Sequence, residues 1–485
     1  MKLHKYILIG CLAGTSMFTS CYDMDVFPQD KLGPSLFWKN EADIQKGVAG
    51  VYSKLYGGYM GWSKYLLEGI TDNAYCKNGD QAAYRNMQMG VLEATSSGPI
   101  VSAYSDSYKG IAACNMFLKN FSDAKQNAKL SEEKASQYEA EVRFIRALCY
   151  FELVQRYGDV PLYKEAISVV EESKIKQSPA NEVLAFIHED LDYAITYLED
   201  KAYSDGHAVK ASAQALKARV ALFQKDWPTV KSLTDEIIAS NKYRLADNYN
   251  SLFIKREGQL GNPEIIFSVN YLNPDVRHNA EMELYYWNAA TPTDDLMACY
   301  EEGDKRKKEW YVYAGVGNKV WTNPFGEQAE TNSGTETGWI LVKHLDKNNP
   351  ETYKLTAYDF RTDNNVIVLR YADVLLMNVE AVLELNGGTT TDSKVLGYIN
   401  EIRKRAGISL LTSVDLSQLY LERRRELAYE GLRHFDLIRT GQAETVMNNL
   451  VTPAGKCSFK NHFYQWPFPQ SEMDANPMLD QKPGY

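Results

Sequence analysis

Residues 132–161 read EEKASQYEAEVRFIRALCYFELVQRYGDVP, and this stretch decides the fold class. Its apolar side chains recur every three or four residues, the spacing that places them on the same face of an α-helix. They form two stripes, one of Val142, Ile145, Leu148 and Cys149 and one of Phe144, Phe151 and Val154. A helix that is apolar on two sides is buried between neighbours. The stretch therefore predicts a central helix that ends at Gly158.

Other stretches repeat the helical pattern on both sides of this one. A first amphipathic helix is predicted over 43–56. Two alanine-rich helices, one over 211–223 and one that starts at Pro228, are separated by a tight turn, as in a tetratricopeptide hairpin of about 34 residues. A comparable pair is predicted within 375–406. The predicted fold class is mainly α, with tetratricopeptide-like hairpins and an irregular, loop-rich lobe that contains a few short strands.

Changes in composition divide the chain into five segments. These are a signal segment (1–20), an extended tether (21–36), an N-terminal helical region (37–241), an irregular insertion (242–365) and a C-terminal helical region with a packed tail (366–485). The insertion mixes strand-like runs with Gly, Asn, Pro and Asp, which favour turns. Loops on a rigid scaffold commonly carry binding residues. The insertion is therefore the expected location of a ligand site.

The N-terminus has the features of a secretory signal. Lys2 and Lys5 precede an apolar run over 6–17, and small residues follow up to Cys21. This run is shorter than the roughly 20 residues that a membrane-spanning helix needs. The residues before Cys21 resemble a loose lipobox, so Cys21 is the predicted site of lipid attachment. Cleavage without lipidation is the alternative.

Charge and cysteine usage exclude several classes of function. The formal net charge of −10 disfavours nucleic acid and other polyanions as partners. The five cysteines after Cys21 lack metal-ligand spacing and are expected to be buried apolar residues. The acidic residues between 294 and 304 match no calcium loop and are interpreted as a solvated surface rather than a calcium site. The sequence thus predicts no metal site and no cofactor.

The sequence leaves a glycosidase open as an alternative function. It lacks the zinc-protease, hydrolase-elbow, phosphate-loop and EF-hand motifs. A glycosidase nevertheless needs only two carboxylates at the right distance in space, and these could lie anywhere among 63 acidic residues. The run ERRRE at 422–426 could suggest a basic patch, but its glutamates favour an ion-paired helix.

Aromatic residues are concentrated between 285 and 325, where nine occur against about five expected from the overall 12%. A flat ring suits the C–H face of a sugar, although most rings in a protein belong to its core. At least one of Trp287, Trp310 and Trp321 is expected to line a ligand site. Further aromatic residues follow Gly57-Gly58 and are expected in a loop opposite this cluster. The complete predicted glycan site is Tyr59, Trp62, Tyr286, Trp287, Asn288, Trp310 and Trp321.

Six stretches carry a resemblance to a known family through their order and spacing. They are CYDMDVFP (21–28), EVRFIRALCYF (141–151) with YGDVP (157–161), RYADVLL (370–376), NEIRKRAG (400–407), the run 422–439 and the ending NPMLDQKPGY (476–485). They are spread from Cys21 to the last residue, so the resemblance extends over most of the chain after Cys21. The chain resembles the SusD/RagB family of Bacteroidetes nutrient-uptake lipoproteins.

The resemblance implies a lipid-anchored protein on the outer membrane that faces the cell exterior. It implies an oligosaccharide ligand, a SusC-like TonB-dependent transporter as partner, and binding without hydrolysis, hence no catalytic residues. Family members recognise different glycans, and the RagB branch is associated with peptides. A peptide binder therefore remains open, as do a glycoside hydrolase and a tetratricopeptide scaffold for protein partners.

Overall fold

Residues 37–485, apart from 78, 80, 255, 347–348 and 354–360, are described by a computed structural model. The predicted signal segment, the tether and the predicted lipid-bearing Cys21 lie outside the described residues. Within the described part of the chain, no helix has the length and hydropathy needed to cross a membrane.

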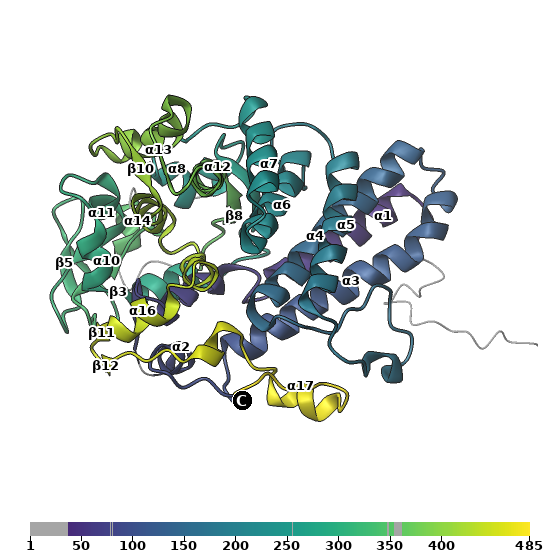
Figure 1. The fold of residues 1–485 in the computed structure, drawn as a ribbon, viewed down its shortest axis with the longest axis horizontal. Helices are drawn as coiled ribbons and strands as arrows, with labels where there is room; N and C mark the ends of the chain where they lie inside the picture. The colour runs from purple at the N-terminus through teal and green to yellow at the C-terminus, as the bar shows by residue number, and fades with distance from the viewer. Residues whose placement is uncertain (1–36, 78, 80, 255, 347–348, 354–360) are drawn as a thin grey trace, which may run out of the picture.

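The predicted N-terminal helices are confirmed, and Figure 1 shows α1, α3, α4 and α5 side by side at one end of the molecule. The α-helices up to residue 239 are α1 (Glu41–Tyr52), α2 (Ala82–Gln88), α3 (Pro99–Asn127), α4 (Glu132–Tyr157), α5 (Ala180–Tyr197), α6 (Lys210–Gln224) and α7 (Trp227–Ala239). Short 3-10 helices accompany them: η1 (Ser53–Tyr56), η2 (Trp62–Ile70) and η3 (Val170–Ser173).

Helix α4 is the central helix that its sequence predicts. It begins where the Ser131 hydroxyl accepts a hydrogen bond from the Lys134 N–H, and it ends at Gly158, whose φ of 65° favours glycine. The helix packs against α3 on one side and α5 on the other. Both apolar stripes are buried, with Val142 and Phe144 fully enclosed. This burial between two helices fixes the N-terminal half of the fold.

The C-terminal half repeats the hairpin theme, because α12 packs against α7 and α13 packs against α12. The remaining α-helices are α8 (Asn250–Phe253), α9 (Arg256–Gln259), α10 (Asp294–Cys299), α11 (Lys305–Trp310), α12 (Tyr371–Leu385), α13 (Ser393–Ala406), α14 (Leu416–Leu427), α15 (Arg433–Arg439), α16 (Ala443–Asn449) and α17 (Gln470–Ala475). They are joined by a π-helix, η4 (Met282–Tyr286), and by the 3-10 helices η5 (Pro350–Tyr353) and η6 (Asn461–Tyr464).

The strands form short antiparallel pairs rather than one large sheet. The pairs are β1 (Ala74–Cys76) with β3 (Ala290–Pro292), β2 (Ile265–Val269) with β8 (Val366–Arg370), β4 (Tyr311–Tyr313) with β7 (Trp339–Leu341), β5 (Val320–Thr322) with β6 (Gln328–Glu330), β9 (Thr389–Thr390) with β10 (Val414–Asp415), and β11 (Val451–Thr452) with β12 (Gly455–Lys456). The β2–β8 pair joins the two ends of the insertion and aligns Ser268 with Ile367.

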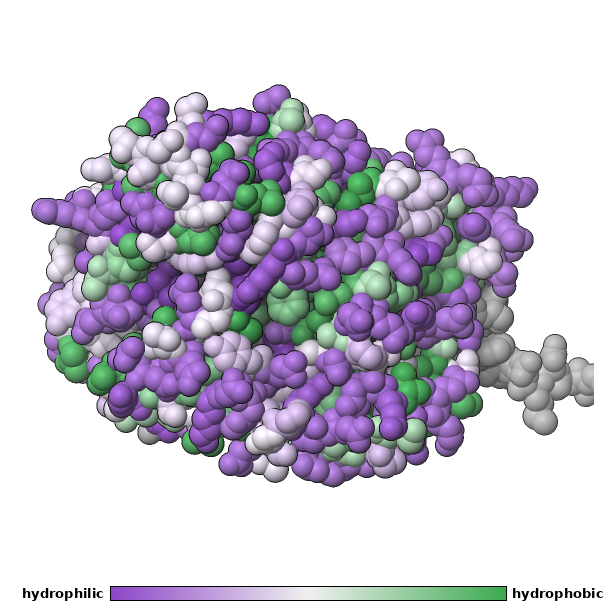
Figure 2. Space-filling view, in the orientation of Figure 1, coloured by the Kyte–Doolittle hydropathy of each residue, from purple (hydrophilic) through white to green (hydrophobic). Residues whose placement is uncertain are grey.

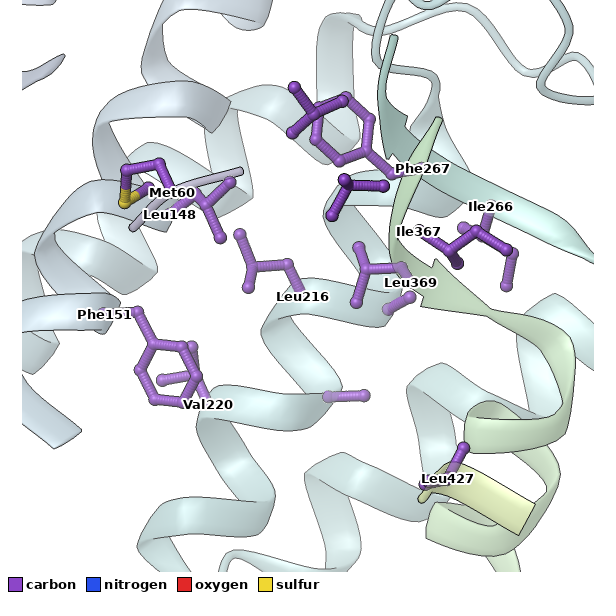
Figure 3. Packing of buried hydrophobic residues seen from close by; sticks show 14 of the residues in the cluster. Met60, Leu148, Phe151, Leu216, Val220, Ile266, Phe267, Ile367, Leu369 and Leu427 are labelled. Carbon is purple, nitrogen blue, oxygen red and sulfur yellow. The ribbon is translucent and has the colours of Figure 1, made fainter. Parts of the chain in front are cut away.

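The β2–β8 pair is also where the insertion meets the helical core. Figure 3 shows Phe267 of β2 and Leu369 of β8 beside Leu216 of α6, and all three are buried. The insertion has a second, smaller core of its own, made of Tyr285, Trp321, Ala329, Ile340, Val342, Leu345 and Tyr353. On the outside, the face in Figure 2 is mostly hydrophilic, with apolar residues scattered over it.

Two further predictions are confirmed and one is wrong. The C-terminal tail packs on the body through the buried rings of Trp466 and Phe468. Of the five cysteines in the described residues, four are buried and Cys299 is partly buried.

The residues after Gly57-Gly58 do not form an exposed loop. They lead into η2, and Tyr59 is 2% exposed because its hydroxyl accepts hydrogen bonds from the buried Arg156 guanidinium at 2.9 and 2.7 Å.

The ERRRE run forms an ion-paired helix, as predicted, but most of its pairs are buried. Glu426 of α14 accepts hydrogen bonds from Arg306 at 3.0 Å, from Arg370 at 2.8 Å and from Arg405 at 2.7 Å. Asp304, expected on a solvated acidic surface, is 1% exposed and pairs with Arg306 at 2.8 Å. A buried guanidinium needs carboxylate partners, so Asp304 is drawn inward. This network joins the insertion to the C-terminal helices.

Burial of His278 predicts that stability depends on pH. Its Nε2–H donates to the Asn364 carbonyl at 2.7 Å, and its Nδ1 accepts from the Ala280 N–H at 3.2 Å. A second proton would face the Ala280 donor, and burial lowers the pKa of His278 to about 4. The ring therefore stays neutral in the folded protein, whereas the unfolded chain takes up a proton below pH 6.5.

We expect His278 to make the free energy of unfolding fall by about 2 kcal/mol between pH 7 and pH 5. Burial raises the pKa of Glu68 to about 7, which acts in the opposite direction because folded Glu68 binds a proton over this range. The measurement is therefore the difference in pH slope between the wild type and H278Q in urea unfolding. H188Q, at a partly exposed histidine, is the control. Equal slopes for H278Q and the wild type would contradict the prediction.

Candidate functional site

Two of the predicted tryptophans are core residues, which corrects the predicted site. Trp310 is 1% exposed and lies between Tyr249 and Lys343. The centroids of the Trp310 and Tyr249 rings are 5.0 Å apart, and the Lys343 ammonium nitrogen lies 4.0 Å from the centroid of the Trp310 ring. Trp321 is 6% exposed and packs in the core of the insertion, 5.5 Å from Tyr353. Neither ring has a face open to a ligand, because the insertion uses its largest side chains to build its interior.

Asn288 and Tyr59 are also enclosed. The Asn288 amide donates to the Thr331 hydroxyl at 3.1 Å and to the Ser333 carbonyl at 2.7 Å. Its φ of 48° lies in the left-handed region, which asparagine tolerates better than most residues. Asn288 therefore shapes the turn beneath the surface instead of facing a ligand, and Tyr59 serves as the partner of Arg156.

Trp62 does not join the other predicted residues. Its half-buried ring lies parallel to His278, with 6.4 Å between centroids, at the start of η2. Among the described residues, no ring contact links Trp62 to Tyr286 or Trp287. Trp62 is therefore not part of the same aromatic pair as Tyr286 and Trp287.

Trp287 and Tyr286 form the exposed part of the predicted site. They close the π-helix η4, in which the Trp287 N–H donates to the Met282 carbonyl five residues earlier, at 2.9 Å. The wider turn of a π-helix redirects side chains and is frequent at functional sites. The Trp287 ring is 41% exposed and stands edge-on to the half-buried Tyr286 ring at 5.1 Å.

A second aromatic pair lies on the neighbouring strands. Tyr313 of β4 is directly opposite Trp339 of β7, and their ring centroids are 4.9 Å apart. Tyr313 is 61% exposed, and the Trp339 Nε1–H donates to the Asp294 carboxylate at 2.9 Å. Sequence reasoning missed Trp339 because it lies beyond the aromatic-rich window that ends at 325.

These two pairs belong to one region, since β7 contacts both β3 and η4. We call Tyr286, Trp287, Tyr313 and Trp339 the aromatic surface. In Figure 1 it belongs to the part of the molecule that carries β3, β5, α10 and α11, at the opposite end from α1 and α3. Half-exposed rings on a rigid frame can stack on the C–H faces of a sugar.

Polar groups reach this region from the N-terminal half of the chain. The β1–β3 pair places the residues after Cys76 beside η4, where the Gln81 amide donates to the Glu283 carboxylate at 3.2 Å. Burial lowers the pKa of nearby Lys77, while Glu336 and Glu283 oppose that shift and Lys319 adds to it. Amide, carboxylate and ammonium groups are the partners that sugar hydroxyls need.

No local signal in the sequence could have identified these polar residues. Gln81 and Glu283 are about two hundred positions apart, and only the β1–β3 pairing brings them together. Among the described residues, no group of three or more His, Cys, Asp or Glu side chains is placed to hold a metal ion.

Residues 228–485 match a family described as the SusD family, and residues 24–222 match one described as starch-binding associating with outer membrane. The SusD-like protein P25 of Formosa agariphila is 27% identical, with 95% of each chain covered. A crystal structure of a SusD-like protein from Bacteroides fragilis has a TM-score of 0.79 at 25% identity, with 95% of this chain and 100% of that chain covered.

Another similar structure is matched over its full length. It is the surface glycan-binding protein A from Bacteroides fluxus, with a TM-score of 0.73 at 25% identity, over 92% of this chain and 100% of that chain.

Proposed function

Because this chain belongs to the SusD/RagB family, we propose that it captures an oligosaccharide outside the cell and delivers it, without hydrolysis, to a SusC-like TonB-dependent transporter. The observation that carries the proposal is the half-exposed Trp287 ring within the aromatic surface. The similarity to a surface glycan-binding protein and to a family described as starch-binding supports a glycan as the ligand class.

The proposed location is the outer membrane, with the protein anchored through a lipid on Cys21. The matching family is described as associating with the outer membrane, which supports this location. The signal-like segment and the lipobox-like residues before Cys21 support the anchor. A lipid anchor would leave the folded body free to approach a transporter in the same membrane.

We expect the wild-type protein to be retarded in native gels that contain one of a panel of plant, host and microbial polysaccharides. W287A should bind that polysaccharide at least about tenfold more weakly, because a lost ring–sugar stack of about 1.4 kcal/mol corresponds to a factor of ten. Mobility measured against polysaccharide concentration gives the dissociation constants. F325A removes an exposed ring from the same insertion, outside the aromatic surface, and is the matched control.

The outcomes separate the proposal from its alternatives. If W287A and the wild type bound the polysaccharide with equal affinity, Trp287 would not be part of the binding site. Release of reducing ends during the assay would indicate a glycosidase. Retardation by no polysaccharide, together with binding of labelled peptides, would replace glycan capture by peptide capture.

A further inference from the structure

A cleft of about 860 Å³ lies on the helical side of the molecule, between α3, α4, α5 and the segment 163–172. This volume falls within the range of about 300–1,000 Å³ that is typical of small-ligand sites. In Figure 1 these helices lie at the opposite end of the molecule from α10, α11 and β5. The cleft is thus separate from the aromatic surface, and its function does not depend on that surface.

The floor of the cleft is an ion-pair network whose charges cancel. Arg146, which is 4% exposed, donates to the two carboxylate oxygens of Asp190 at 2.8 Å each. Arg143 donates to Glu139 at 2.6 Å and reaches Asp190 at 3.3 Å. Two guanidinium groups therefore face two carboxylates, and the floor carries no net charge.

Three lysines lie on the rim of the cleft. Unlike the arginines of the floor, they are not paired with carboxylates. Lys119 and Lys125 project from α3, and Lys164 projects from the segment 163–172. Lys119 donates to the Ser168 hydroxyl at 3.1 Å, and the Lys164 ammonium lies 5.6 Å from the centre of the Phe186 ring. Within the described part of the chain, none of the three lysines forms an ion pair with a carboxylate.

Two further carboxylates line the cleft and offset part of the positive charge of the lysines. Glu172 accepts a hydrogen bond from the Ser168 N–H at 2.7 Å and so holds its own loop, and Glu165 lies beside Lys164 in sequence. Three unpaired ammonium groups thus face two carboxylates, which leaves a local positive excess in a chain of net charge −10. A local excess against the overall charge favours an anionic ligand.

We propose that this cleft binds the carboxylate or sulfate groups of an acidic glycan, with Lys119, Lys125 and Lys164 contacting the anionic groups. The three ammonium groups come from separate positions around the rim, which suits charges repeated along a chain better than one compact anion. The partly exposed Tyr163 ring in the same wall offers a face for the sugar between them.

The test measures binding of two polyanions by the full protein in native gels at near-physiological ionic strength. Polygalacturonate supplies carboxylates, dextran sulfate supplies sulfates, and unmodified dextran is the neutral reference. The variant K119Q/K125Q/K164Q is compared with K394Q/K404Q/K456Q, which removes three exposed lysines away from the cleft and changes the net charge equally.

We expect the wild type to bind at least one polyanion, and the cleft variant to bind it more than tenfold more weakly. The remote variant should stay within about twofold, because screening weakens charges that are distant from the ligand. The polymer that binds identifies the anionic group. The proposal is overturned if the wild type binds neither polyanion, or if the two variants lose affinity equally. Either result leaves the Trp287 experiment unaffected, because that experiment concerns another surface.

Discussion

Replacing Glu426 with glutamine is expected to lower the free energy of unfolding by about 3–5 kcal/mol, as for other buried ion pairs that lose one partner. Glu426 is fully buried and accepts hydrogen bonds from Arg306, Arg370 and Arg405. The amide keeps the shape of the side chain but not its charge, so three buried guanidinium groups lose a shared counter-charge. Urea unfolding at pH 7 measures the loss.

The same carboxylate predicts a sensitivity to acid. Burial acts to raise the pKa of Glu426, but the guanidinium groups of Arg405, Arg370 and Arg306 outweigh it and hold the pKa at about 2. The folded pKa lies below the unfolded value of 4.5, so this stabilisation is complete above pH 4.5 and is lost as the pH falls towards 2. E426Q should lack this part of the acid dependence.

The control for this experiment is E302Q, at an exposed glutamate of the insertion that lies close in sequence to Arg306. Its effect should stay within about 0.5 kcal/mol, as for surface substitutions in general. A loss below about 1 kcal/mol for E426Q would mean that the remaining carboxylates, among them Glu422 and Glu264, compensate for the missing charge.

Replacing Trp310 with alanine is expected to cost about 3–5 kcal/mol of stability, the usual range when a large buried aromatic side chain is removed. The Trp310 ring fills the space between Tyr249, Phe253 and the Lys343 ammonium group. Thermal and urea unfolding measure the cost. W287A is the matched comparison, and its stability should change by no more than about 0.5 kcal/mol because the Trp287 ring is 41% exposed.

For polysaccharide affinity we expect the opposite order, with the larger loss from the change at Trp287 and the smaller loss from the change at Trp310. W310F keeps an aromatic ring in the core, so it yields folded protein in which affinity can be measured. We expect W310F to bind polysaccharide like the wild type and W287A to bind it weakly. If W310F lost affinity for polysaccharide while its stability stayed unchanged, Trp310 would have to be part of the ligand site.

The sequence predicted the helical framework well. The two apolar stripes of 132–157 correspond to α4, and the alanine-rich hairpin corresponds to α6 and α7. Helix formation depends on side chains three or four residues apart, so the information is local and can be read from the chain. The strand-like runs at 265–269 and 366–369 were also found, because β-branched residues mark them.

The sequence predicted only some of the exposed rings. The aromatic excess indicated a segment in which Trp287 is exposed and Tyr286 is partly exposed. Composition could not distinguish these rings from Trp310 and Trp321, since a tryptophan can equally build a core or an exposed site. Trp310 is buried in the main core and Trp321 in the second, smaller core of the insertion, so tertiary packing decides which rings are buried.

Local periodicity and composition are enough to predict the helical class and the segment that holds the exposed rings. The tertiary structure alone decided which rings are exposed, which acidic residues are buried beside Arg306, and which lysines gather around the cleft. The physical reason is the range of the interactions. The β1–β3 pair joins residues about two hundred positions apart, and the Glu426 network joins four separate segments, so neither leaves a local pattern in the chain.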